Sequence, residues 1–191
     1  MHSAEHRALR ELRVFGTQLA THWDRLARRF GGAEAERLAV GAADARAMLV
    51  EVDAAADARD VPTRPAAALT GRLTSARPMA PDHLLERNQA LRYAVLDVQH
   101  CATLLAYAAA LAATRGDEEL RALLASWQER LEGHERAVRA AAIALGGRPD
   151  DAVAPAIPTV PGRLGQRLAA SGGALGEWVD RRSAARRGAA E

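Results

Sequence analysis

The sequence contains no lysine: arginine supplies all 26 cationic side chains, against 24 acidic ones, for a formal net charge of +2. Schiff-base catalysis and P-loop phosphate binding both depend on a lysine amine, so the absence of lysine excludes these two classes. A nucleic-acid-binding domain usually carries a clear excess of positive charge. With a charge this close to zero, we expect no nucleic-acid partner.

Cysteine and aromatic residues are scarce as well: there is one cysteine, Cys101, and 4% of residues are aromatic. One thiol cannot form an internal disulfide, and residues 1–13 are charged from the start with no signal-peptide core, so we expect a cytoplasmic protein. The 49% hydrophobic content is rich in alanine and leucine, which favours close helix packing over sheets. The most apolar stretch, residues 93–114, is interrupted by Asp97 and His100, which indicates a buried helix and no transmembrane segment.

Apolar residues recur at steps of three and four in four segments, which predicts four helices. The first segment runs from Leu9 to Phe30 and the second from Leu38 to Ala56. Their predicted buried positions are Leu9, Leu12, Gly16, Leu19, Trp23, Leu26, Phe30, Leu38, Ala42, Ala45, Leu49, Val52 and Ala56. A Gly31-Gly32 turn separates the two segments, so they are expected to form an antiparallel hairpin.

The third and fourth segments form a second predicted hairpin, which turns at Gly116-Asp117. The third is expected to begin at Asp82 as its N-cap and to be apolar around nearly its whole circumference, which is typical of a central helix. The fourth follows Asp117 as its N-cap and stops at Gly146-Gly147. Their predicted buried positions are Leu91, Val95, Leu96, Val98, Leu104, Leu105, Leu111, Leu120, Leu124, Trp127, Leu131, His134, Val138, Ala141 and Leu145.

The connection between the hairpins, residues 61–82, is long enough to run the length of a bundle, and it includes a possible short helix at 66–73. The fold class is therefore predicted to be all-α: an antiparallel four-helix bundle over residues 1–147. Residues 148–191 are expected to be a linker and an amphipathic helical tail, in which four glycines weaken the apolar repeat of Leu164, Leu168, Leu175 and Trp178. Three alternatives stay open for this tail: it docks on the bundle, it is partly disordered, or it binds a partner or a surface.

Three polar residues stand out in the second hairpin. His134 occupies an apolar position of the fourth segment, and Asp97 and His100 share one face of the third. His100 precedes Asp117 by 17 residues and His134 follows it by 17. At about 1.5 Å per residue both lie ~25 Å from the turn, so the two imidazoles are predicted to face each other across the hairpin.

Such a cluster has three interpretations. Buried polar groups come in hydrogen-bonded sets, so the simplest is a polar cluster without metal. A single zinc or iron ion is the second, held by Asp97, His100, His134 and a water. A di-iron centre is the third, but it needs more carboxylates: Leu131 stands where the fourth segment should supply one, and the first hairpin is predicted to direct no acidic side chain inward. Cys101 is read as a small core residue.

Two hairpins, a long middle connection and the stretches VQHCATLLAY, GDEELRALL and RLEGHERAV make the chain similar to the ferritin-like superfamily, especially its small bacterial stress-associated members. The likeness covers roughly residues 5–147. Such families often carry a Glu-His pair on the third helix, and here the pair reads Gln99-His100. The resemblance therefore implies a ferritin-like bundle, with His100 and His134 as retained ligand positions and Asp97 as a substitute ligand.

Two functions follow as expectations. The first is a non-enzymatic ferritin-like scaffold that has lost its metal centre and binds a protein partner or associates with itself. The second is a metal-binding ferritin-like protein that stores or oxidises iron through the reduced His/Asp site. A third hypothesis is a surface or membrane adaptor that acts through residues 160–191 of the tail.

Overall fold

The computed structural model describes residues 2–61 and 85–156. These residues form four long helices, a short 3₁₀ turn and one short terminal helix, and they contain no strand, which confirms the all-α class. The elements are α1 (Ser3–Ala27), α2 (Gly32–Asp57), α4 (Arg87–Thr114), α5 (Glu118–Ala144), η2 (Leu145–Gly147) and α6 (Pro149–Ala152).

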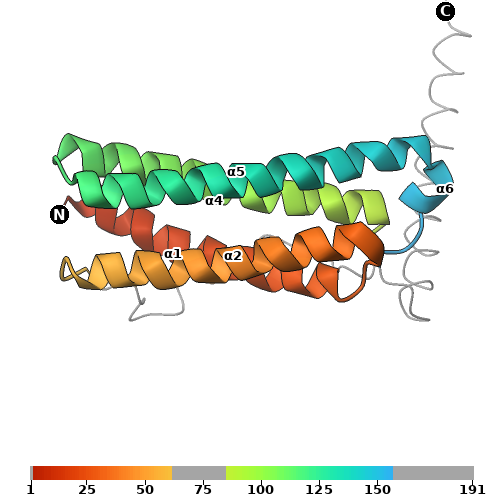
Figure 1. Cartoon of the computed structure of the whole chain (residues 1–191), viewed down its shortest axis with the longest axis horizontal. Coiled ribbons are helices and arrows are strands. Elements are labelled where there is room, and N and C mark those ends of the chain that lie inside the picture. Colours follow the sequence, from red (N-terminus) through yellow and green to blue (C-terminus); the bar gives the residue numbers. More distant parts are fainter. Residues whose placement is uncertain (1, 62–84, 157–191) are drawn as a thin grey trace, which may run out of the picture.

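The four long helices lie in two layers, with α1 beside α2 in one and α4 beside α5 in the other (Figure 1). Across the layers, α1 contacts α4 and α2 contacts α5. All four contribute to one continuous hydrophobic core. The short turns after α1 and α4 make each layer an antiparallel hairpin, and the middle connection leaves the end of α2 and enters the start of α4 at opposite ends of the long helices (Figure 1). The short helix expected at 66–73 lies outside the described residues.

The predicted buried positions agree closely with the structure. In α1, α2 and α5, every predicted apolar position is buried except Leu49, which is partly buried against the core. In α4 the expectation of burial all round is wrong at Leu96, which is 43% exposed. A helix in a two-layer arrangement contacts two neighbours and keeps one side toward solvent, so Leu96 lies on an outer face.

The start of α4 also differs from the prediction. Asp82 is not described, but Leu85 and Glu86 are non-helical, so the helix begins at Arg87 and Asp82 cannot be its N-cap. The backbone N–H of Glu86 donates to the side-chain oxygen of Gln89 at 3.1 Å, which caps the helix start. The same segment pairs with the end of the described chain: the N–H of Ala156 donates to the carbonyl of Leu85 at 2.9 Å.

Within the described residues, α4 is the one helix long and apolar enough to suit a membrane span. Half of its most apolar window is buried against the other helices, which agrees with a core helix, and no clear transmembrane segment follows from it.

A glycine sets the spacing of the first layer. A Cβ atom added at Gly41 of α2 would lie 2.2 Å from Cζ3 of Trp23, whose indole is 1% exposed. The Trp23 Nε1–H donates to the carbonyl of Ala94 on α4 at 3.2 Å, which fixes the ring in place. Trp23 thus fills the space between α1, α2 and α4, and α2 approaches it only because residue 41 has no side chain.

Candidate functional site

The three predicted metal ligands have three different environments. His100 is 43% exposed; its ring packs edge-on against Phe15 of α1 at 4.2 Å between centroids, and its Nε2 lies 4.0 Å from a carboxylate oxygen of Glu11. Asp97 contacts α1 and His134 contacts α2. The expectation that His100 and His134 face each other is therefore wrong. Each imidazole points across the layers to the opposite hairpin and not toward the other helix of its own hairpin.

Asp97 pairs with a histidine of the opposite hairpin. The Nδ1 of His22 on α1 lies 2.5 Å from a carboxylate oxygen of Asp97, and the two side chains are 5% and 11% exposed. An N–H to carboxylate contact at this distance is a short, charge-assisted type of hydrogen bond. It joins α1 to α4 in the interior, beside the Trp23 bond to Ala94.

His134 makes the corresponding contact between α5 and α2. Its Nε2 lies 2.7 Å from a carboxylate oxygen of Asp44 on α2, and both side chains are partly buried. Two turns earlier on α5, the Nε1–H of Trp127 donates to the carboxylate of Glu51 at 2.9 Å. Each inter-layer contact therefore contains one His–Asp pair and one tryptophan hydrogen bond.

Inward-directed acids on the first hairpin contradict another expectation. The first hairpin was expected to direct no acidic side chain inward, yet the carboxylates of Asp44 and Glu51 on α2 both reach α5, and Glu5 of α1 is 1% exposed. A signal was available: Asp44 and Glu51 are seven residues apart, as are Trp127 and His134. Equal spacing on two antiparallel helices places both pairs in register, two turns apart.

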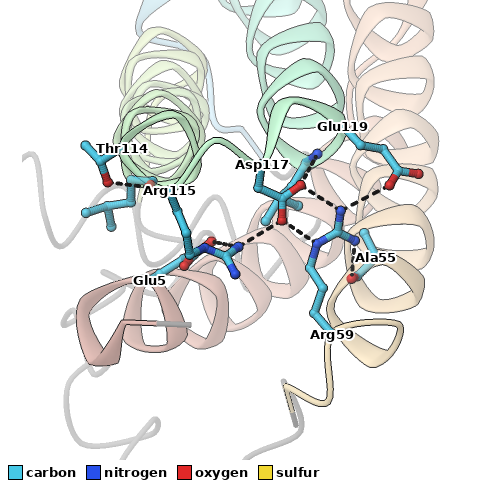
Figure 2. A network of polar contacts seen from close by, with 9 residues as sticks. Glu5, Ala55, Arg59, Thr114, Arg115, Asp117 and Glu119 are labelled. Atoms are coloured by element: carbon cyan, nitrogen blue, oxygen red, sulfur yellow. Dashed lines mark hydrogen bonds and ion pairs between the residues drawn. The ribbon is translucent and has the colours of Figure 1, made fainter.

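A second polar network joins the helix ends where the chain turns from α4 to α5. The guanidinium of Arg59, just after α2, donates Nε to one oxygen of Asp117 at 2.7 Å and Nη2 to the other at 2.9 Å (Figure 2). Arg115 donates Nη2 to Asp117 at 2.8 Å and to the buried Glu5 at 2.9 Å. These bonds connect α1, α2 and the turn between α4 and α5 (Figure 2).

Asp117 is the centre of this network. Besides its two arginine partners it accepts a hydrogen bond from the backbone N–H of Leu120 at 3.1 Å, as the predicted N-cap of α5. The hydrogen bonds from Arg59, strengthened by the Leu120 bond and by the nearby Arg115 charge, hold the pKa of the Asp117 carboxyl well below its usual range. Since the carboxylate is favoured in the folded state, ionised Asp117 stabilises the fold.

The low pKa of Asp117 sets a sign for the pH dependence. Its contribution is complete above the unfolded-state pKa of about 4 and is lost as the pH falls from there toward the folded pKa. We expect Asp117→Asn to lower the free energy of unfolding at pH 7 by about 2 kcal/mol, and the difference from wild type to shrink below about pH 4. Urea titrations at pH 7 and pH 3 measure both values.

Glu119→Gln is the matched control. Glu119 also accepts from Arg59, at 3.2 Å, but its side chain is 90% exposed. Exposed ion pairs contribute little, so we expect a change below about 1 kcal/mol at either pH. A deficit in Asp117→Asn that is equally large at pH 3 and pH 7 would contradict the assignment of the acid-sensitive contribution to Asp117.

Cys101 lies in the core as predicted, fully buried on α4. Burial, with a smaller contribution from the Asp97 charge, raises the pKa of its thiol to about 12. Nucleophilic chemistry and metal ligation both require the thiolate, so Cys101 serves as a core residue here.

The possibilities for metal ligation in the described residues are limited. Residues 2–61 and 85–156 include no group of three or more His, Cys, Asp or Glu side chains placed to hold a metal ion. A structural zinc site needs four such ligands and a catalytic one needs three. What the interior contains is a set of paired polar contacts, each from one hairpin to the other.

No family model, no curated protein and no solved structure matches this chain. The functional argument therefore depends on the residues and contacts described above.

Proposed function

We propose that this protein is a non-enzymatic cytoplasmic scaffold with a ferritin-like four-helix bundle, in which paired polar side chains occupy the interior in place of a metal centre. The topology is compatible with that type: two antiparallel hairpins, with the ends of the middle connection at opposite ends of the helices. Function then resides on the outer surface, where a protein partner or a second copy binds.

One observation supports the proposal above the others. Each of the two interior histidines, His22 and His134, is engaged by an aspartate of the opposite hairpin, at 2.5 and 2.7 Å. A ligating histidine directs a ring nitrogen at the metal and uses the other for an orienting hydrogen bond, and several such side chains must converge. Here the pairs lie in separate inter-layer contacts, one between α1 and α4 and the other between α2 and α5.

The pairs are suited to a structural role. A hydrogen bond between partly buried polar groups adds about 1–3 kcal/mol when one partner is charged, and it fixes which faces of two helices meet. Alanine-rich interfaces are smooth and tolerate sliding, so directional bonds at fixed positions specify the register. Two His–Asp pairs and two tryptophan bonds therefore define how one hairpin sits on the other.

Metal analysis tests the proposal. Untagged protein, purified without chelators, is expected to contain far less than one metal ion per chain by elemental analysis. Adding Zn²⁺ or Fe²⁺ should leave the unfolding midpoint unchanged. A metal ion that bound the folded state would raise the midpoint, since at a free concentration of 100 times its Kd it would add about 2.7 kcal/mol of stability.

Two variants show what result would contradict the scaffold proposal. Near-stoichiometric iron that is lost in both His100→Ala and His134→Ala would contradict the scaffold and restore the iron-binding alternative. The pair is informative because His134 is engaged by Asp44, whereas His100 is largely exposed beside Phe15. A metal site that needs both residues would require a rearranged interior.

A further inference from the structure

An apolar groove runs along the outer side of the second layer, between α4 and α5. It encloses about 560 Å³, and its floor and walls include Val95 and Leu96 of α4 and Ala142 and Ile143 of α5. Leu96 is 43% exposed and Ile143 is 70% exposed. Both are large aliphatic side chains that line the same groove and are open to solvent there.

A second groove of about 340 Å³ continues the first along α4. The two share Arg92 and Leu96, and the second adds Leu85 and Tyr93, the latter 43% exposed. Together they follow α4 from Leu85, just before its first turn, to Gln99. At about 1.5 Å per residue this is a path of ~20 Å.

The described chain ends at one end of this path. Ala156, the last described residue, donates its N–H to the carbonyl of Leu85 at 2.9 Å, and Ala154 accepts from the N–H of Arg87 at 2.9 Å. Residues 157–191 therefore begin beside Leu85, which itself lines the second groove. From Ala156 to Leu164 are eight residues, which span up to ~27 Å when extended, so the first leucine of the tail reaches any point of the grooves.

The sequence of the tail complements the grooves in chemistry. Its apolar residues Leu164, Leu168, Leu175 and Trp178 recur at steps suited to one face of a helix. The tail thus offers an apolar stripe for the leucine-lined walls.

We propose that the C-terminal segment, residues 157–191, docks in cis into the paired grooves of α4 and covers Leu96, Ile143 and Tyr93. Because tail and groove belong to one chain, the effective concentration is in the millimolar range, and a weak apolar contact suffices to keep the grooves covered. This inference does not depend on whether the interior binds metal.

Cross-linking of the full chain tests the proposal. One cysteine is introduced into the tail as Ser171→Cys, and a second at the groove as Ile143→Cys. The matched control places the second cysteine at Val40→Cys, which is 51% exposed on α2, within its first three turns and so toward the same end of the molecule. The native Cys101 is buried with a pKa of about 12, so a short bismaleimide leaves it unreacted in folded protein.

We expect intramolecular cross-linking through position 143 to be roughly tenfold faster than through position 40. Adding Leu168→Asp to the 143/171 pair should abolish that preference, because it removes an apolar contact but not the proximity of the tail. Equal rates for the two positions would overturn the proposal and leave the groove to another molecule. A product that is mainly a concentration-dependent dimer would also overturn it, in favour of a second copy of the chain.

Discussion

Asp97→Ala is expected to lower the free energy of unfolding by about 3 kcal/mol, the largest effect of any single polar substitution in the described interior. The carboxylate of Asp97 lies 2.5 Å from Nδ1 of His22, and the two side chains are 11% and 5% exposed. Removing one partner leaves the other desolvated without its bond, which costs about 1–3 kcal/mol for a neutral pair and 3–5 kcal/mol for an ion pair. Urea or guanidinium titration measures the loss.

His100→Ala is the control from the same helix face. His100 follows Asp97 by one turn, but its side chain is 43% exposed and its nearest carboxylate, on Glu11, is 4.0 Å away. A substitution at such a position usually changes stability by less than about 0.5 kcal/mol, although the lost ring contact with Phe15 adds to this. The two residues that the sequence groups together are thus predicted to differ severalfold in their effects.

A double-mutant cycle identifies the partner. His22→Ala and Asp97→Ala, alone and combined, should show a coupling energy of about 1–3 kcal/mol, because residues in direct contact are non-additive. His134→Ala combined with Asp97→Ala should be additive, since His134 is engaged by Asp44 in the other inter-layer contact. Strong coupling of Asp97 with His134, and none with His22, would restore the predicted His/Asp site of the second hairpin.

Sequence periodicity was sufficient for the core because burial repeats with the helix turn. The positions from Leu9 to Phe30 and from Leu120 to Leu145 were identified without knowing which helices are neighbours. Periodicity also showed that His134 belongs to an inward face. Each of these inferences depends only on the sequence pattern of a single helix.

The partners of the polar residues could not be found in the same way. His100 and His134 lie at equal heights in one hairpin, but height alone does not give the direction of a side chain around its helix. Asp97 turns toward α1 and His134 toward α2, since each lies on the side of its helix that meets the opposite layer. The lateral order of four helices, which decides those neighbours, is a tertiary property that a single-helix pattern does not contain.

The start of α4 was missed for a local reason. Asp82 is a good N-cap residue and was favoured on residue type, whereas the Glu86–Gln89 spacing is the pattern that the structure uses. The pairing of Leu85 with Ala156 then keeps the backbone before Arg87 extended. This contact spans more than half of the described chain, and no local pattern predicts it.

Gly41→Ala is expected to destabilise the protein by about 2 kcal/mol or more, although alanine is the better helix former. Replacing glycine by alanine within a helix favours folding by about 1 kcal/mol. At position 41 the new methyl would lie 2.2 Å from Cζ3 and 2.5 Å from Cε3 of Trp23. That ring is 1% exposed and bonded to Ala94, so it cannot move aside, and overpacking of this kind costs about 1–3 kcal/mol or more.

Gly133→Ala on α5 is the matched control, with the opposite sign. A Cβ there meets only Nη2 of Arg136, at 4.0 Å, so the substitution gains helix propensity without a clash and should raise stability by up to about 1 kcal/mol. Thermal unfolding of both variants therefore separates packing from propensity. A gain in Gly41→Ala as large as in Gly133→Ala would show that α1 and α2 are not held this close in solution.

Gly16→Ala extends the comparison to an intermediate case. Its Cβ would lie 2.9 Å from Cε of Met48 and from Cδ2 of Leu49, the far ends of flexible side chains on α2. Met adapts to added volume by rotation, so most of the clash is relieved and the net change should fall between the other two. The expected order of stability, Gly133→Ala above Gly16→Ala above Gly41→Ala, follows the rigidity of what each methyl meets. An inverted order would mean that residue 41 faces away from Trp23. It would then also contradict the packing of the first layer, which places His22 opposite Asp97.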